Sequence, residues 1–358
     1  MPTSASRTPN ASTKVHWEDI AVAQPAVYGA YEVTKDEIIA YARVYDPQLH
    51  HIDEEAAKLS LTKGLCASGW HSCAMFMRIF YDGTLKNSTS LGAAGIDEVK
   101  WLKPVRPGFV LKVRTTCEEK RLMRSRPGVG IARMKHELLN QHGEVLMSIE
   151  NSQFMGVRDP ANAAAFETAS PATAAGPPKA AATPAAMATN EEIPRGNHFE
   201  DQIIGRRTQL GSHTFTSADI KAFAQKFDPQ PFHVDEAAAK TSLFGGLCAS
   251  GWHTAAEFIG HMIRARLKEE EIFRSNGESI AMWGPSPGFK NLKWPKPVFA
   301  GDTIRFRVTN SGKVDLKSRP ERGMLVFLNE GFNQKDELVF QVTGQILVPR
   351  RVPLAATL

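Results

Sequence analysis

Hydrophobic residues recur at helical spacing in two places far apart in the chain. The first stripe occupies positions i, i+3, i+4 and i+7 and consists of Ile38, Tyr41, Ala42 and Tyr45. The second has the same spacing and consists of Ile220, Phe223, Ala224 and Phe227. Thr34 and Glu37 form a capping-box signature before the first stripe. Each stripe predicts a short amphipathic helix that ends at an aspartate, because the residue after that aspartate is proline.

Two further segments are apolar on nearly every side and predict buried central helices. They read GLCASGWHSCAMFMRIF from Gly64 and GLCASGWHTAAEFIGHMI from Gly246. Hydrophobic and polar residues alternate elsewhere, which predicts strands over residues 109–123, 130–139, 144–157, 304–310, 323–332 and 337–348. The expected architecture is therefore α+β, with an antiparallel sheet around a long helix in each half.

The two halves are copies of one another. Asp228 follows Asp46 by 182 residues, and the same shift brings His51 onto His233 and one GLCASGWH onto the other. Later segments match at a shift of 193, as VKWLKPVRPG from Val99 does with LKWPKPVFAG from Leu292. The second copy thus carries eleven extra residues, expected around positions 268–287, after its long helix. A repeat of this length indicates two tandem domains rather than a solenoid.

Composition sets the limits of these domains. An N-terminal tail over 1–14, a first domain over 15–158, a flexible linker over 159–190 and a second domain over 191–350 are expected. The linker is mostly Ala, Pro, Thr and Ser, which bury too little apolar surface to offset the entropy of ordering.

The overall character of the chain is that of a globular protein acting on small molecules. Of its 358 residues 42% are hydrophobic and 23% charged, and the net charge is +5. Because the basic residues are scattered, nucleic-acid binding is not expected. No apolar run approaches the roughly 18 residues of a membrane span, and the N-terminus lacks the apolar core of a secretion signal. A cytoplasmic location without membrane association is expected, with the four cysteines reduced.

An acid and an imidazole stand five residues apart in both copies. The segments are YDPQLHHIDEEAAK from Tyr45 and FDPQPFHVDEAAAK from Phe227, which place Asp46 before His51 and Asp228 before His233. Taken singly, such a pair is more often a turn cap and a loop histidine than a catalytic dyad. Its repetition favours a site. The later aspartates, Asp53 and Asp235, are interpreted as caps of the next helix.

These motifs resemble the MaoC-like dehydratases, (R)-specific enoyl-CoA hydratases with a hot-dog fold. The resemblance covers both halves and implies a pseudo-dimeric double hot dog. In that family the Asp and His activate the water that adds to a trans-2-enoyl thioester. A glycine N–H at the start of the buried helix binds the thioester oxygen. The resemblance carries these roles to Asp228, His233 and Gly251 in one copy and to Asp46, His51 and Gly69 in the other.

The implied reaction is a reversible syn hydration of an enoyl-CoA without metal or other cofactor, CoA being part of the substrate. An N–H at a helix N-terminus stabilises the negative charge that develops on the thioester oxygen. Which of the Asp and His is the base toward water is left open by the sequence. So are the acyl chain and the assembly of pseudo-dimers into homo-oligomers, which is common in this fold. Arg126 and Arg319, in matching turns, are candidate contacts for the CoA phosphates, although solvated turn residues are the simpler interpretation.

The sequence departs from the family pattern in three ways. Gln48 and Gln230 stand where Asn is frequent, and a hydroxyl residue expected to support the aspartate is missing at Met77 and Ile259. Leu49 replaces Pro231 in the first copy, which predicts a looser turn. The C-terminal site is therefore expected to be the stronger one.

The sequence also offers three alternatives to the hydratase. His50, His51 and His71 lack the spacing of a zinc site, so no metal is expected. His71 and His253 are interpreted as residues that pack or form a hydrogen bond, and the tryptophans that precede them as core residues. A hot-dog thioesterase would use a carboxylate on the central helix, and Glu257 is present only in the second copy. A non-catalytic acyl-CoA binding module remains the third reading.

Overall fold

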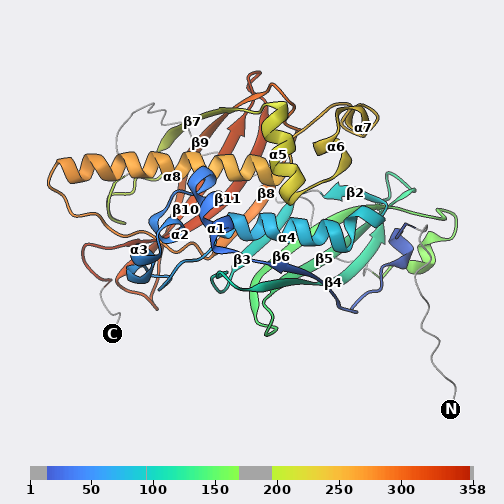
Figure 1. Cartoon of the computed structure of the whole chain (residues 1–358), viewed down its shortest axis with the longest axis horizontal. Coiled ribbons are helices and arrows are strands. Elements are labelled where there is room, and N and C mark those ends of the chain that lie inside the picture. The colour runs from blue at the N-terminus through green and yellow to red at the C-terminus, as the bar shows by residue number, and fades with distance from the viewer. Residues whose placement is uncertain (1–13, 94, 169–195, 355–358) are drawn as a thin grey trace, which may run out of the picture.

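The computed structural model describes residues 14–93, 95–168 and 196–354, which form two halves of the same design (Figure 1). The first half contains β1 (Ala26–Glu32), α1 (Lys35–Tyr45), α2 (Leu49–Ile52), α3 (Glu54–Leu59), α4 (Gly69–Gly83), β2 (Ser90–Ala93), β3 (Ile96–Trp101), β4 (Val110–Leu122), β5 (Val129–Leu139) and β6 (Val145–Gly156). The second contains β7 (Arg207–Thr214), α5 (Ser217–Phe227), α6 (Pro231–Val234), α7 (Glu236–Lys240), α8 (Gly251–Ser275), β8 (Gly288–Lys293), β9 (Thr303–Asp315), β10 (Arg322–Phe332) and β11 (Leu338–Pro349).

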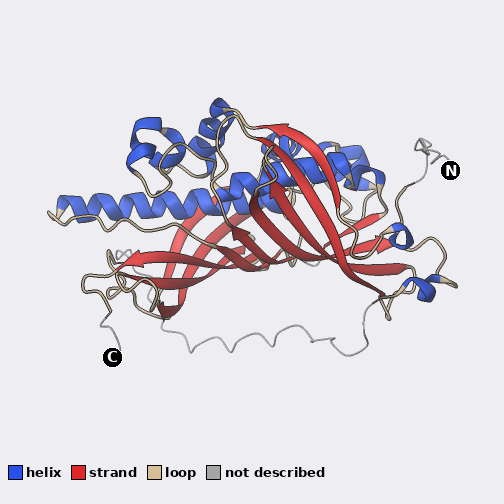
Figure 2. Ribbon diagram, turned by 90° about the horizontal axis from the view of Figure 1, so that it is seen from below, coloured by secondary structure: helices blue, strands red, loops and turns tan. Residues whose placement is uncertain are grey.

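All strands belong to one antiparallel sheet that runs through both halves. Its order is β1-β4-β5-β6-β3-β8-β11-β10-β9-β7, with β2 paired to β6. The halves meet where β3 pairs with β8, in a register that sets Glu98 opposite Lys290. Figure 2 shows the helices gathered on one face of this curved sheet. The result is the expected double hot dog.

The central helices α4 and α8 pack against each other in the concave face of the sheet. Both helices are buried along their first turns, where most of their own side chains are small, aromatic or aliphatic. Trp70 of α4 stacks on Phe289 of the other half, with ring centroids 4.6 Å apart. The core is therefore shared between the halves, and the predicted core role of Trp70 and Trp252 is confirmed.

Two details differ from the sequence interpretation. Helix α8 continues to Ser275, so part of the second copy's insertion lengthens the helix instead of following it. At the start of the expected linker, a 3-10 helix (Ala163–Phe166) packs on the first half and buries Ala163, because that small side chain fits beside Trp17 and Cys117. Residues 169–190 of the linker lie outside the described residues.

The structure bears on two further expectations. The four cysteines are buried and free, as predicted. Among the described residues, no helix is both long and apolar enough to cross a membrane.

Candidate functional site

The two candidate aspartates occupy the same local structure. Asp46 caps the C-terminus of α1 and Asp228 that of α5, and each is only 3% exposed. The helices stop there because the following Pro47 and Pro229 cannot continue them. The predicted end of each amphipathic helix is confirmed.

The two histidines lie on the one-turn helices α2 and α6 and are 5% exposed. Nδ1 of His51 is 2.7 Å from the carbonyl oxygen of Cys66, and Nδ1 of His233 is 2.7 Å from that of Cys248. Since a carbonyl only accepts, Nδ1 must carry the proton and donate it. Nε2 of each neutral ring is then an acceptor.

Each Nε2 faces its aspartate across a short gap. The distance from Nε2 to Oδ2 is 3.7 Å for the His51–Asp46 pair and 3.5 Å for the His233–Asp228 pair. Both atoms are acceptors, and the gap exceeds the length of an ordinary hydrogen bond. The arrangement suits a small donor such as water held between the two.

The support for the aspartates comes from residues that the sequence interpretation missed. Ser68 donates to Oδ2 of Asp46 at 2.5 Å, and Ser250 donates to Oδ2 of Asp228 at 2.6 Å. The other oxygen, Oδ1, accepts from Gln48 at 2.8 Å in the first copy and from Gln230 at 2.9 Å in the second. The hydroxyl missing at Met77 and Ile259 is therefore supplied by the residue just before each central helix.

The predicted loosening of the first turn is not seen. Leu49 stands where the second copy has Pro231, yet the hydrogen bonds around Asp46 and Asp228 agree to within 0.1 Å. The hydrogen bonds to the aspartate hold the turn in the same conformation in both copies, so Pro231 is not required for it. The geometry gives no reason to prefer one copy.

Burial shapes the charge state of the first site. Desolvation raises the pKa of Asp46 and lowers that of His51 to about 4. The neighbouring His50 is also shifted, chiefly by burial, to a pKa of about 4. Both rings are therefore neutral near pH 7, as acceptor chemistry at Nε2 requires.

The two glycines begin the central helices, with Gly69 first in α4 and Gly251 first in α8. Among the hydrogen bonds of the described residues, none is donated by either backbone N–H, as expected for the first turn of a helix. A Cβ on Gly69 would lie 2.4 Å from the ring of Trp101, and one on Gly251 would lie 2.4 Å from that of Trp294. Only glycine fits between the helix start and this ring.

Each half also contacts the site of the other. Arg78 of α4 donates to the carbonyl oxygens of Gln225 and Lys226, at 3.0 and 3.2 Å, near the end of α5. Burial, together with the charges of Asp82 and Asp228, raises the pKa of Tyr81 of the first half. The two sites are built jointly.

Among the described residues, none of the remaining candidates forms a hydrogen bond or ion pair with either Asp–His pair. Arg126 and Arg319 are exposed in equivalent turns. Arg126 borders a hollow of about 130 Å³ whose lining includes Leu243, from the loop before α8, and neither Asp–His pair. His71 and His253 are buried packing residues, stacked on Tyr41 and Phe223. Asp53 and Asp235 cap α3 and α7 as predicted.

Comparison with known proteins identifies the family of this fold. The model of the MaoC like domain matches residues 21–138 and 200–324. An (R)-specific enoyl-CoA hydratase of Rhodospirillum rubrum is 29% identical over 160 residues, 43% of this chain and 94% of that protein.

Solved structures agree over nearly the whole chain. A putative MaoC domain protein dehydratase from Chloroflexus aurantiacus superposes with a TM-score of 0.71 at 16% identity, covering 98% of this chain and all of that one. Rv0216 of Mycobacterium tuberculosis, described as a double hotdog fold, gives 0.66 at 14% identity over 93% of this chain and 98% of that one.

The fold and the paired sites define a double hot-dog protein with an Asp, His and Gly set in each half. The family match extends over both halves and most of the chain. The chain therefore belongs to the MaoC like domain family.

Proposed function

We propose that the protein is a hydro-lyase that reversibly hydrates a trans-2-enoyl-CoA to the (R)-3-hydroxyacyl-CoA. The observation that carries the proposal is the paired acceptor geometry, with Nε2 and Oδ2 3.5 to 3.7 Å apart in each half. A water between them donates one hydrogen to each and directs a lone pair outward. That orientation is what a nucleophile adding to an alkene requires.

The proposed step balances without a cofactor. The water oxygen bonds to C3 of the enoyl thioester while one O–H bond breaks and its proton passes to the Asp–His pair. The pair returns a proton to C2 on the same face. Between these events the negative charge lies on the thioester oxygen, where the free N–H of Gly69 or Gly251 stabilises it.

Two observations support an acyl-CoA substrate. The relative from Rhodospirillum rubrum is named an (R)-specific enoyl-CoA hydratase, and its likeness spans about one half of this chain. Arg126 borders a hollow together with Leu243, in the loop that follows α7. A guanidinium at this position suits the phosphates of CoA.

The test follows the loss of ultraviolet absorbance by the conjugated enoyl thioester, with crotonyl-CoA and a longer trans-2-enoyl-CoA. Wild type is compared with the variants Asp46→Asn/His51→Ala and Asp228→Asn/His233→Ala, and with both changes combined. Because the two sites have the same geometry, each double variant is expected to keep about half of the activity. The combined variant should lose it.

Other outcomes would separate the alternatives. Loss confined to one variant would mean one working half. Release of free thiol without consumption of the alkene would replace the hydratase with a thioesterase. Tight acyl-CoA binding that survives the combined variant, with no turnover, would indicate a binding module.

A further inference from the structure

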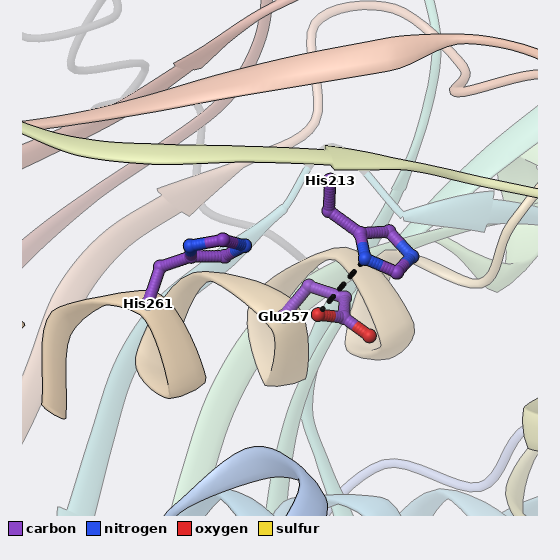
Figure 3. A group of neighbouring side chains, drawn as sticks. All are labelled: His213, Glu257 and His261. Atoms are coloured by element: carbon purple, nitrogen blue, oxygen red, sulfur yellow. Dashed lines mark ion pairs between the residues drawn. The ribbon is translucent and has the colours of Figure 1, made fainter. Parts of the chain in front are cut away.

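A second cluster of chemically capable side chains is made of residues outside both Asp–His pairs. It consists of His213 on β7 and of Glu257 and His261 on α8 (Figure 3). One ligand atom from each lies within 4.8 Å of the others. Glu257 and His261 are one helical turn apart, so they share a face, and β7 passes over that face with His213.

The first half serves as an internal control, because it has the same backbone without these groups. The residues 182 positions earlier are Tyr31, Met75 and Ile79. Packing confirms part of this equivalence, since a Cβ on Gly29 would meet Ile79 and one on Gly211 would meet His261. All three positions therefore change together, from phenol, thioether and alkyl side chains to imidazole, carboxylate and imidazole.

The electrostatics of the cluster also differ between the halves. In the first half the buried carboxylate of Glu37 has a cation nearby, with Lys226 Nζ at 3.2 Å. The residue that corresponds to Lys226 is Val44. Arg264 of α8 donates to the Val44 carbonyl at 3.0 Å. Burial raises the pKa of Glu257 to about 7, although the charge of Arg264 acts in the opposite direction.

The imidazoles are in the state that binds metal. Burial lowers the pKa of His213, and that of His261 to about 4, so both are neutral near pH 7. Within the described part of the chain, the buried Nε2 of His213 has no hydrogen-bond partner.

We propose that His213, Glu257 and His261 bind one divalent transition-metal ion of the zinc class and thereby clip β7 to α8. Two imidazoles and one carboxylate suit this class of ion and leave one position for water. Ligands around a tetrahedral ion stand about 3.4 Å apart. His213 Nδ1 and Glu257 Oε2 are already 3.4 Å apart, so a side-chain rotation of His261 completes the set.

The experiment measures metal binding by the full chain, with any affinity tag removed and metal stripped by a chelator that is then dialysed away. Zinc is titrated against a chromophoric competitor, and cobalt gives a visible spectrum that reports the ligand geometry. The variants His213→Tyr, Glu257→Met and His261→Ile take each residue from the first half. Glu257→Gln preserves shape and removes only the charge, and His142→Gln alters an exposed histidine as the matched control.

Wild type and His142→Gln are expected to bind one equivalent, and each cluster variant to bind at least tenfold more weakly. Zinc should also raise the Tm of wild type and not that of the cluster variants. The proposal is overturned if no zinc binds, or if all the variants bind it as wild type does. Since neither readout depends on turnover, the result is independent of the proposed hydratase activity.

Discussion

Arg78 of the first half donates a hydrogen bond to the backbone carbonyl of Lys226, 3.2 Å away, just before the second catalytic candidate Asp228. The guanidinium thus caps the C-terminal end of α5, where a positive charge also complements the helix dipole. The position of Asp228 depends on a helix from the other half.

Replacing Arg78 by alanine should therefore weaken the C-terminal site. In the Asp46→Asn/His51→Ala background, where only that site remains, we expect kcat to fall several-fold and the unfolding free energy to drop by about 1 kcal/mol. Steady-state kinetics and denaturant unfolding measure the two effects. Arg43→Ala, an exposed change in the last turn of α1, should leave kcat unchanged, because the remaining site does not depend on α1's own dipole. An unaltered kcat would mean that the cap does not position Asp228.

Ser250 should matter for activity beyond its role as a helix cap. Its hydroxyl donates to Asp228 and accepts from Trp252 N at 3.2 Å. Loss of a hydrogen bond to a charged group costs about 1.5–3 kcal/mol, so Ser250→Ala is expected to lower kcat about 10- to 100-fold at that site. Ser250→Thr keeps the hydroxyl and should recover most of the rate. If alanine and threonine behave alike, the hydroxyl does not act on Asp228.

Adding one methyl group at Gly251 should destabilise the fold. The new Cβ would lie 2.4 Å from the ring of Trp294, and overpacking of this kind costs about 1–3 kcal/mol. Gly251→Ala is thus expected to lower Tm as well as activity. Gly128→Ala adds the same methyl group where nothing lies within 4 Å and serves as the control in the same thermal-unfolding experiment.

Stability should fall in mild acid because of His136. This ring is 1% exposed, hydrogen-bonded to Thr115 at 2.9 Å, and burial lowers its pKa from 6.5 to about 4. Below pH 6.5 the His136 imidazole binds a proton in the unfolded chain but stays neutral in the folded chain. Stability is therefore full above pH 6.5 and declines toward pH 4, by up to ~1.4 kcal/mol per pH unit for this group.

Denaturant unfolding between pH 4 and 7 measures this slope. The matched variant is His136→Asn, because Asn329 stands at the corresponding position of the second half and is also buried. The unfolding free energy of the variant should change less steeply with pH, because its unfolding takes up nearly one proton fewer than that of wild type. Equal slopes would show that another group, such as the buried His51, accounts for the acid sensitivity.

The sequence predicts the features that strong local patterns encode. The helical stripes before Asp46 and Asp228, the buried central helices and the long inner strands are confirmed, because each element buries a regular face. Strand β1 was missed because its side chains are mostly exposed at the edge of the sheet and do not alternate. Hydrophobic periodicity therefore does not mark this strand in the sequence.

The supporting serines were missed for a different reason. Ser68 and Ser250 are visible in both copies of CASGWH and carry the signature of a helix N-cap. Their contacts with aspartates 22 residues earlier arise only when the helices pack. The cluster of His213, Glu257 and His261 likewise joins a strand to a helix far along the chain, so only Glu257 and His261 could have been paired by spacing.

The pairing of β3 with β8 joins two halves that belong to a single polypeptide. In a dimer of identical chains every substitution appears twice, and a residue useful on one side must be tolerated on the other. Covalent fusion removes this symmetry constraint. One half can keep Tyr31, Met75 and Ile79 while the other acquires His213, Glu257 and His261, so a new specialisation can arise without disturbing the duplicated Asp–His pairs.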